Sequence, residues 1–229
     1  MGLAHSPKIL TDGLVSLLDA GNTKSYPGSG TTWTDLIGSN DGTLINGPTF
    51  DSANGGAILF DGSNNDRVTI SNDSSLSFTT TFSLSCWFNF STLPDGEVPL
   101  LRKEMVWQLG FQNSNTIRCL IQTDVGVSGW TAANDVTYYF ATNTWYNMTM
   151  TYRGSGLYGN NMLIYVNAEL VKAATVTGDV SNNTNDVQVG YHSGKYLDGR
   201  MSNLSIYNKT LTAAEITQNY TALKGRYGY

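Results

Sequence analysis

The clearest pattern in the chain is an alternation of apolar and other residues over residues 82–90. Every second position there carries one of five apolar side chains, Phe82, Leu84, Cys86, Phe88 and Phe90. A period of two places these side chains on one face of a β-strand. The segment therefore predicts a long strand whose Phe82 face packs into a core. Trp87 takes the other face, where it would line either an exposed sheet or a second buried layer.

Shorter segments that also predict strands recur along the chain, and turns rich in Gly, Asn and Ser separate them. They cover residues 13–20, 56–62, 66–71, 105–111, 116–122, 145–152, 161–167, 169–172, 186–191 and 201–207. Residues 105–111 and 116–122 repeat the period of two. Strands of this length and spacing are typical of a sandwich of two antiparallel sheets. Asn167 and Ala168 predict a tight turn between two of these strands.

The end of the chain predicts one short helix. Thr212 and Glu215 have the spacing of a capping box, in which each side chain binds the other residue's backbone amide. Ile216, Tyr220 and Leu223 then fall on one helix face. No linker divides the chain, so residues 13–229 are predicted to form one domain and residues 1–12 an N-terminal arm.

Charge and composition exclude several classes of function. The chain has 13 Lys and Arg against 18 Asp and Glu, a net charge of -5, which gives no basic surface for nucleic acid. No apolar run reaches the length of a membrane-spanning helix, and residues 1–10 lack the apolar core of a secretory signal. Cys86 and Cys119 both alternate with apolar residues, which favours two buried thiols over a disulfide.

Five ordered segments carry a resemblance to a known family. They are Phe60-Asp-Gly with Asp66-Arg-Val, residues 82–88, residues 145–152, residues 163–167 and residues 198–216. Together they resemble the laminin-G-like members of the concanavalin A-like lectin/glucanase superfamily over residues 55–223. The resemblance implies an all-β jelly-roll sandwich of two antiparallel sheets with one short C-terminal helix.

The start of the chain carries a second resemblance. Residues 5–20 and 25–36 are similar to a leader found in proteins of marine bacteriophages and their hosts. In that group the domain belongs to virion structural proteins such as head or tail fibres and capsid decorations. The resemblance implies a place on the virion surface, with other virion proteins and host-surface glycans as partners. It leaves open whether the domain binds glycans or serves assembly, and whether it forms a homo-oligomer.

The acidic residues argue against catalysis. Glucanases of this superfamily use two glutamates on one strand, since glycoside hydrolysis needs two carboxylates across the scissile bond. This chain has four glutamates, Glu97, Glu104, Glu169 and Glu215, and the one at strand spacing from another carboxylate is Glu97, beside Asp95. That pair lies between two prolines, which favours a solvated turn. We therefore expect a protein that is not an enzyme.

Sugar binding would use exposed aromatic rings together with amides and carboxylates, because a ring stacks on the apolar face of a sugar. The candidate carbohydrate-binding residues are Trp130, Asn134, Asp135, Tyr138, Tyr191 and His192. Trp130 is the strongest of them, because its Gly- and Ser-rich surroundings predict a loop. A Tyr-rich surface is equally typical of protein interfaces, so sugar contact and subunit contact both remain open.

Calcium is the one cofactor that the family resemblance raises. Related folds hold a structural calcium partly through an Asp in the last long strand, and Asn203 stands at the matching position. An uncharged ligand lowers calcium affinity. Asp61 and Asp198 are the candidate neighbours, although each precedes Gly, where an Asp commonly binds its own backbone in a turn.

Overall fold

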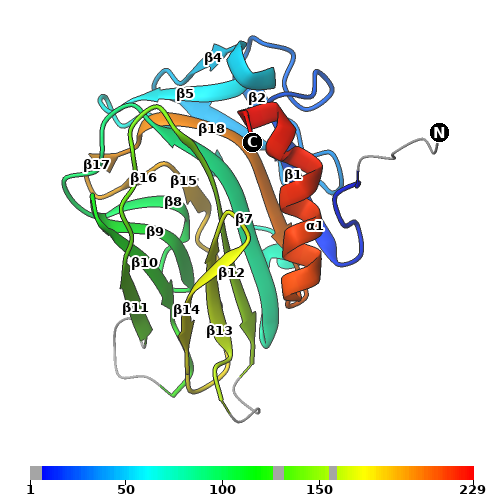
Figure 1. Ribbon diagram of the computed structural model, residues 1–229, viewed down its shortest axis with the longest axis vertical. Helices are drawn as coiled ribbons and strands as arrows, with labels where there is room; N and C mark the ends of the chain where they lie inside the picture. Colours follow the sequence, from blue (N-terminus) through cyan, green and yellow to red (C-terminus); the bar gives the residue numbers. More distant parts are fainter. Residues whose placement is uncertain (1–6, 126–131, 155–158) are drawn as a thin grey trace.

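The computed structural model describes residues 7–125, 132–154 and 159–229 (Figure 1). Within them lie eighteen β-strands, one α-helix and three short 3-10 helices, η1 (Ala53–Gly55), η2 (Ser74–Leu76) and η3 (Lys224–Tyr227). Two eight-stranded antiparallel sheets pack face to face, so the predicted sandwich is confirmed. No helix in the described part of the chain combines the length and apolar character needed to cross a membrane.

The first sheet, sheet A, is built around the longest strands. Its order is β14 (Glu169–Ala174), β13 (Met162–Val166), β12 (Trp145–Arg153), β7 (Thr81–Phe90), β18 (Asp198–Tyr207), β5 (Ala57–Asp61) and β4 (Thr49–Asp51), with β1 (Leu14–Asp19) also paired to β18. The predicted turn at Asn167 and Ala168 joins β13 to β14, and both residues have left-handed φ angles of 52° and 65°. Hairpin turns of this kind need positive φ.

The second sheet, sheet B, faces the Phe82 side of sheet A. Its order is β11 (Ala132–Thr137), β10 (Thr116–Ile121), β9 (Trp107–Asn113), β8 (Val98–Lys103), β15 (Val187–Val189), β6 (Arg67–Ile70), β3 (Gly42–Ile45) and β2 (Thr32–Trp33). A two-stranded ribbon of β16 (Tyr191–His192) and β17 (Lys195–Tyr196) lies outside both sheets in the pairing scheme.

The core fills the space between the sheets and contains the predicted apolar face of β7. Phe88 and Phe90 meet Phe111 of sheet B at ring-centroid distances of 5.4 and 5.0 Å. Each large apolar side chain buried here contributes about 1.5–3 kcal/mol. Cys86 and Cys119 are buried, unpaired thiols within this core, as predicted, and burial raises the pKa of both.

A second buried layer covers the outer face of sheet A. Helix α1 (Ala213–Leu223) begins at the predicted capping box of Thr212 and Glu215 and lies along this face (Figure 1). Trp87 points outward from β7 and stacks on Tyr220 at 5.4 Å and on Tyr227 at 4.1 Å. Trp87 therefore belongs to a second buried layer rather than to an exposed sheet.

The described part of the predicted N-terminal arm lies against this helix. The backbone amide of Leu10 donates to Asn219 at 2.7 Å, and Gln218 donates to the carbonyl of Lys8 at 2.8 Å. Ile9 and Leu10 pack into the same apolar cluster as Ile216. Residues 7–12 are therefore held on the helix-covered side of the sandwich.

Candidate functional site

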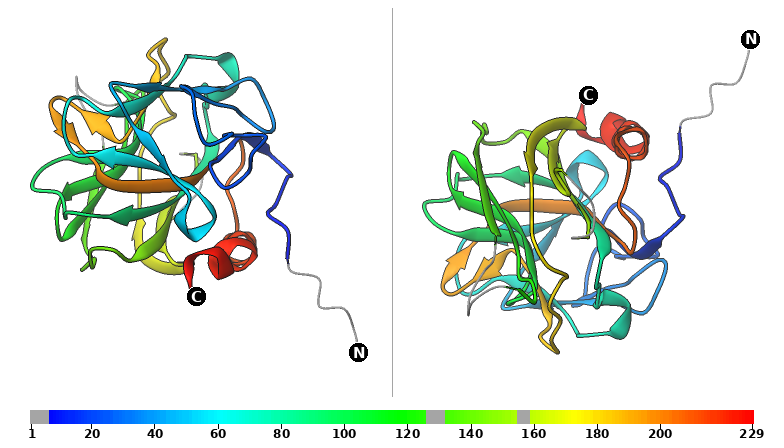
Figure 2. Two further views of the ribbon diagram at one scale, coloured as in Figure 1. Left: turned by 90° about the horizontal axis from the view of Figure 1, so that it is seen from above. Right: turned by 90° about the horizontal axis from the view of Figure 1, so that it is seen from below.

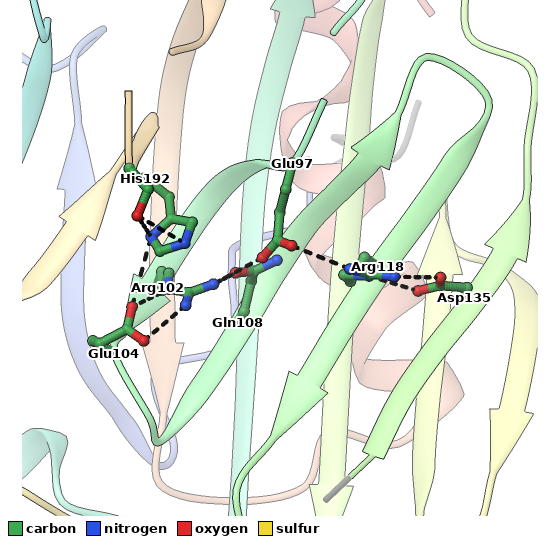
Figure 3. Close-up of polar contacts among 8 residues, drawn as sticks. Glu97, Arg102, Glu104, Gln108, Arg118, Asp135 and His192 are labelled. Atoms are coloured by element: carbon green, nitrogen blue, oxygen red, sulfur yellow. Dashed lines mark hydrogen bonds and ion pairs between the residues drawn. The ribbon is translucent and has the colours of Figure 1, made fainter. Parts of the chain in front are cut away.

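The outer face of sheet B carries a group of charged side chains that ion pairs connect. Gln108 lies between the core residues Trp107 and Leu109, and Arg118 between Ile117 and Cys119, so both point away from sheet A. The helix in the described part of the chain covers sheet A, which leaves this face without a helical layer. We call it the open face, made by Glu97, Arg102, Glu104, Gln108, Arg118, Asp135 and His192 (Figure 3).

Arg102 is the most buried charge on the open face, with 4% of its side chain exposed. Its guanidinium donates to both carboxylate oxygens of Glu104, at 2.6 and 2.9 Å, to Glu97 at 2.9 Å and to the Gln108 side chain. A buried guanidinium requires such partners, because leaving one unpaired is costly. Arg102 therefore fixes the positions of two carboxylates on the sheet.

Arg118 continues the same chain of ion pairs toward the edge of the sheet. It donates to the second oxygen of Glu97 at 3.1 Å and to both oxygens of Asp135 at 3.0 and 2.8 Å. These ion pairs form one continuous run of alternating charge across β8, β10 and β11, in the spatial order Glu104, Arg102, Glu97, Arg118 and Asp135 (Figure 3). Three of the five N–H groups of Arg118 are used, and two have no partner in the described residues.

The protonation states follow from these contacts. Burial raises the pKa of Glu104, but the hydrogen bonds and charge of Arg102 outweigh it and hold the pKa below its usual value. Burial and the nearby Arg102 lower the pKa of His192, whose Nδ1 lies 3.6 Å from Glu104. Hydrogen bonds to Asp135 raise the pKa of Arg118. At neutral pH Glu104 is therefore ionised and His192 is uncharged.

Aromatic rings border the open face. Tyr191 of β16 stacks on Tyr196 with ring centroids 5.5 Å apart, and the guanidinium of Arg67 lies 5.3 Å from the centre of the Tyr191 ring. Tyr138 packs on the core ring of Phe140 at 4.7 Å and is half-buried. The Tyr191 ring thus already contacts Tyr196 and Arg67, and Tyr138, Tyr191 and Tyr196 are all half-buried.

The structure brings together part of the predicted carbohydrate site. Asp135 and His192 both join the open face, and Tyr191 adjoins His192 on β16. Trp130 lies outside the described residues, and of Asn134 only the backbone in β11 is described. Sequence analysis missed the other five residues of the open face, Glu97, Arg102, Glu104, Gln108 and Arg118. It favoured a solvated turn for Glu97, whereas the Glu97 carboxylate lies between Arg102 and Arg118.

The predicted calcium ligands fall into two places. Asp61 and Asp198 are direct partners across β5 and β18, whereas Asn203 lies farther along β18, opposite Trp87 and Asp19. Asp61 accepts hydrogen bonds from the amide and hydroxyl of Ser63 at 2.8 and 2.9 Å, which is the predicted turn contact. No group of three or more His, Cys, Asp or Glu side chains in the described ranges is arranged to hold a metal ion.

Asp66 is a carboxylate beside Asp61 that sequence analysis did not propose as a site residue. It is 1% exposed, and its Oδ2 accepts from the backbone amide of Asp61 at 3.3 Å. Its Oδ1 has no hydrogen-bond partner within residues 7–125, 132–154 and 159–229. Burial, together with the charge of Asp61, raises the pKa of Asp66 above its ordinary value.

Comparisons with known proteins agree with the sandwich. The family model of the concanavalin A-like lectin/glucanases superfamily matches residues 61–217. A search of curated proteins found no significant match.

Several solved structures share the fold at low sequence identity. Domain 4 of AbnA, a GH43 extracellular arabinanase from Geobacillus stearothermophilus in complex with arabinotriose, is 14% identical with a TM-score of 0.66, covering 90% of this chain and 98% of that one. The binding domain of Paraclostridial Mosquitocidal Protein 1 is 16% identical with a TM-score of 0.66, covering 91% of this chain and 52% of that one. Trypanosoma rangeli sialidase in complex with sialic acid is 15% identical with a TM-score of 0.66 over 99% of this chain. This chain spans 34 to 37% of the length of the sialidase chains it matches.

Proposed function

Because the chain belongs to the concanavalin A-like lectin/glucanases superfamily, we propose that it is a non-catalytic, glycan-binding module that uses the open face of sheet B. The observation that carries this proposal is the continuous run of ion pairs from Glu104 to Asp135. It sets charged donors and acceptors at fixed positions on a sheet, beside the stacked rings of Tyr191 and Tyr196.

Pre-ordered side chains suit the recognition of sugar hydroxyls. A flexible arginine or glutamate loses side-chain entropy when it binds, and this loss is smaller when the free protein already holds the side chain in place. Arg118 is held on two sides, and two of its N–H groups, which no described residue engages, can donate to a hydroxyl. Glu97 and Asp135 offer acceptors on either side of it. The neighbour that carries arabinotriose has the same fold, which supports a saccharide as the ligand.

The absence of catalysis is part of the proposal and rests on the state of the carboxylates. A glycosidase needs one carboxylic acid that is protonated at working pH to donate to the leaving group. Glu97 and Glu104 both contact Arg102, and the pKa of Glu104 is lowered rather than raised. Release of reducing sugar from β-glucans by the purified protein would contradict this part.

We further propose that the module works on the surface of a virion, as a head or tail fibre or a capsid decoration. The support is the similarity of residues 5–20 and 25–36 to leaders of marine bacteriophage virion proteins. Mass spectrometry of purified phage particles tests the location directly. The protein should be found in the particles, and its absence from them would remove the virion role while leaving glycan binding untouched.

A glycan array tests the binding itself. Purified protein should bind a restricted set of glycans, because the fixed charges of the open face match a limited number of hydroxyl arrangements. An array without any binding would favour the second candidate, an assembly protein whose surface contacts other virion subunits. The exposed ring of Tyr139, with 76% of its surface accessible, is the feature that supports that candidate.

A further inference from the structure

A pocket of about 480 Å³ lies on the outer face of sheet A, beside the end of the helical layer. Its floor is a single row of side chains across three neighbouring strands. Trp145 of β12 is the direct partner of Asn89 of β7, and Asn89 is the direct partner of Arg200 of β18. Asn89 lies between the core residues Phe88 and Phe90, so it points out of the sandwich, away from the open face.

Segments distant in sequence form the walls. Beside the floor, residues 51, 53–54, 143–144 and 227–229 line the pocket. The close approach of β18 to β7 fixes the floor, because a Cβ on Gly199 would lie 2.1 Å from the backbone oxygen of Asn89. The pocket is therefore shaped by strand pairing as well as by loops.

The polar groups of the floor are not all used by the protein. Asn89 is 4% exposed. In the described residues, its side-chain oxygen Oδ1 has no partner and its side-chain nitrogen Nδ2 donates no hydrogen bond. Buried amides are almost always paired, so an unpaired one on a pocket floor calls for an explanation. Trp145 is 5% exposed, and its indole Nε1 also lacks a partner in the described part of the chain.

The charges of the pocket balance one another. Arg200 donates from Nε to Asp51 at 2.6 Å and from Nη1 to the hydroxyl of Ser91 at 3.4 Å, while its Nη2 has no partner in the part of the chain that is described. The hydrogen bond from Arg200 lowers the pKa of Asp51, which keeps the pair ionised. Among the side chains that line the pocket, one guanidinium stands against one carboxylate, which leaves no net side-chain charge to attract an ion.

Aromatic surface completes the pocket. The Tyr227 ring packs 4.8 Å from Trp145, and the half-exposed Tyr229 donates its hydroxyl to the backbone carbonyl of Trp145. Ring faces beside amide, guanidinium and carboxylate groups are the combination that binds the apolar faces and hydroxyls of a sugar.

We propose that this pocket is a second saccharide site, which binds one uncharged sugar unit between Tyr229 and the Asn89–Arg200 floor. Asn89 supplies the unused amide, Arg200 a donor and Asp51 an acceptor for ring hydroxyls. The site lies on the opposite face of the sandwich from the open face and shares no residue with it. Its failure can be told from a failure of the open face, because each site has its own variant, Asn89→Ala for the pocket and Arg118→Ala for the open face.

The test is NMR of the full chain, in which the indole N–H signals of the tryptophans report on the pocket. Trp145→Phe identifies the Trp145 signal. The probes are glucose, galactose, mannose, N-acetylglucosamine and arabinose, with N-acetylneuraminic acid as the charged comparison. At least one neutral sugar should shift the Trp145 signal in the wild-type protein and equally in Arg118→Ala, which alters only the open face.

Asn89→Ala should weaken that sugar at least about tenfold, because it removes the central polar group of the floor. Asn115→Ala is the matched control, since Asn115 is an exposed residue of the β9–β10 turn whose side chain makes no hydrogen bond in the described residues. If Asn89→Ala does not fold, Tyr229→Ala replaces it, because it removes the wall and leaves the floor intact. The proposal is overturned if no neutral sugar shifts the Trp145 signal, if the pocket variant binds as the wild type does, or if the charged sugar alone binds.

Discussion

The sharpest prediction concerns Arg118 on the open face. Replacing it with Ala removes the two N–H groups that have no partner among the described residues, along with three internal hydrogen bonds. A hydrogen bond to a charged group contributes about 1.5–3 kcal/mol net. Losing one such bond to a glycan hydroxyl should therefore raise the Kd about 10- to 150-fold.

The same change should cost little stability. The ion pairs of Arg118 with Glu97 and Asp135 are partly exposed, at 22% for the Arg118 side chain and 26 and 36% for its partners. Pairs of this kind contribute about 0–1 kcal/mol each. For a domain of this size the melting temperature should fall by less than about 8 °C.

Isothermal titration with a glycan selected on the array measures the Kd, and urea unfolding measures the stability. Arg153→Ala is the matched control, because Arg153 is an exposed arginine of sheet A that donates to the carbonyl of Asn160. The role of the open face would be refuted by a folded Arg118→Ala variant whose Kd stays within about twofold of the wild-type value. A change that small is far below the increase in Kd expected from losing one charged hydrogen bond.

The remaining predictions concern Asp66, calcium binding and Trp130. Asp66→Asn should raise the free energy of unfolding at pH 7. Because folding raises the pKa of Asp66, the stabilisation from its protonated form is fully present below the ordinary pKa of 3.8 and is lost as pH rises through the folded pKa. Asn stays uncharged at every pH, so the variant does not lose this stabilisation. Urea unfolding should show this gain at pH 7 and none below pH 3.8, and a gain that persists in acid would contradict it. Calcium bound by Asp61 and Asp198 should raise the melting temperature, and a chelator should reverse the rise. The rise should vanish when both residues are replaced by Asn, and an equal rise in that double variant would place any calcium elsewhere. Trp130→Ala should abolish binding to the array-selected glycan, and unchanged binding would remove Trp130 from the site.

The strands that sequence analysis predicted best are those with an unbroken period. β7 alternates without interruption, and the capping box of α1 needs only two residues at fixed spacing. β8 escaped prediction because Pro99 lies within it and the pairing with β9 shifts between Pro99 and Leu101. Such a bulge places successive apolar residues inward and hides the period of two.

The site was harder to predict than the fold because it depends on register. Glu97 and Arg118 are twenty-one residues apart and meet only because β9 lies between β8 and β10 in a fixed pairing. One signal was present in the sequence, since Arg118 interrupts an apolar strand on the face opposite Ile117 and Cys119. An arginine in that position needs acidic partners, but the sequence does not say which.

The packing of residues 7–12 against α1 has a practical consequence for how the molecule can be presented. The N-terminal segment and the C-terminal helix lie on the same side of the sandwich (Figure 2). A surface attached through either of them would hold the protein with sheet B directed into solution. Tyr229 lines the pocket on sheet A, so attachment after it would crowd that pocket. Pro7 does not line the pocket, so attachment ahead of Pro7 would leave it free. Comparing sensor chips coupled at the two ends would thus separate ligands of the two faces without any change to a binding residue.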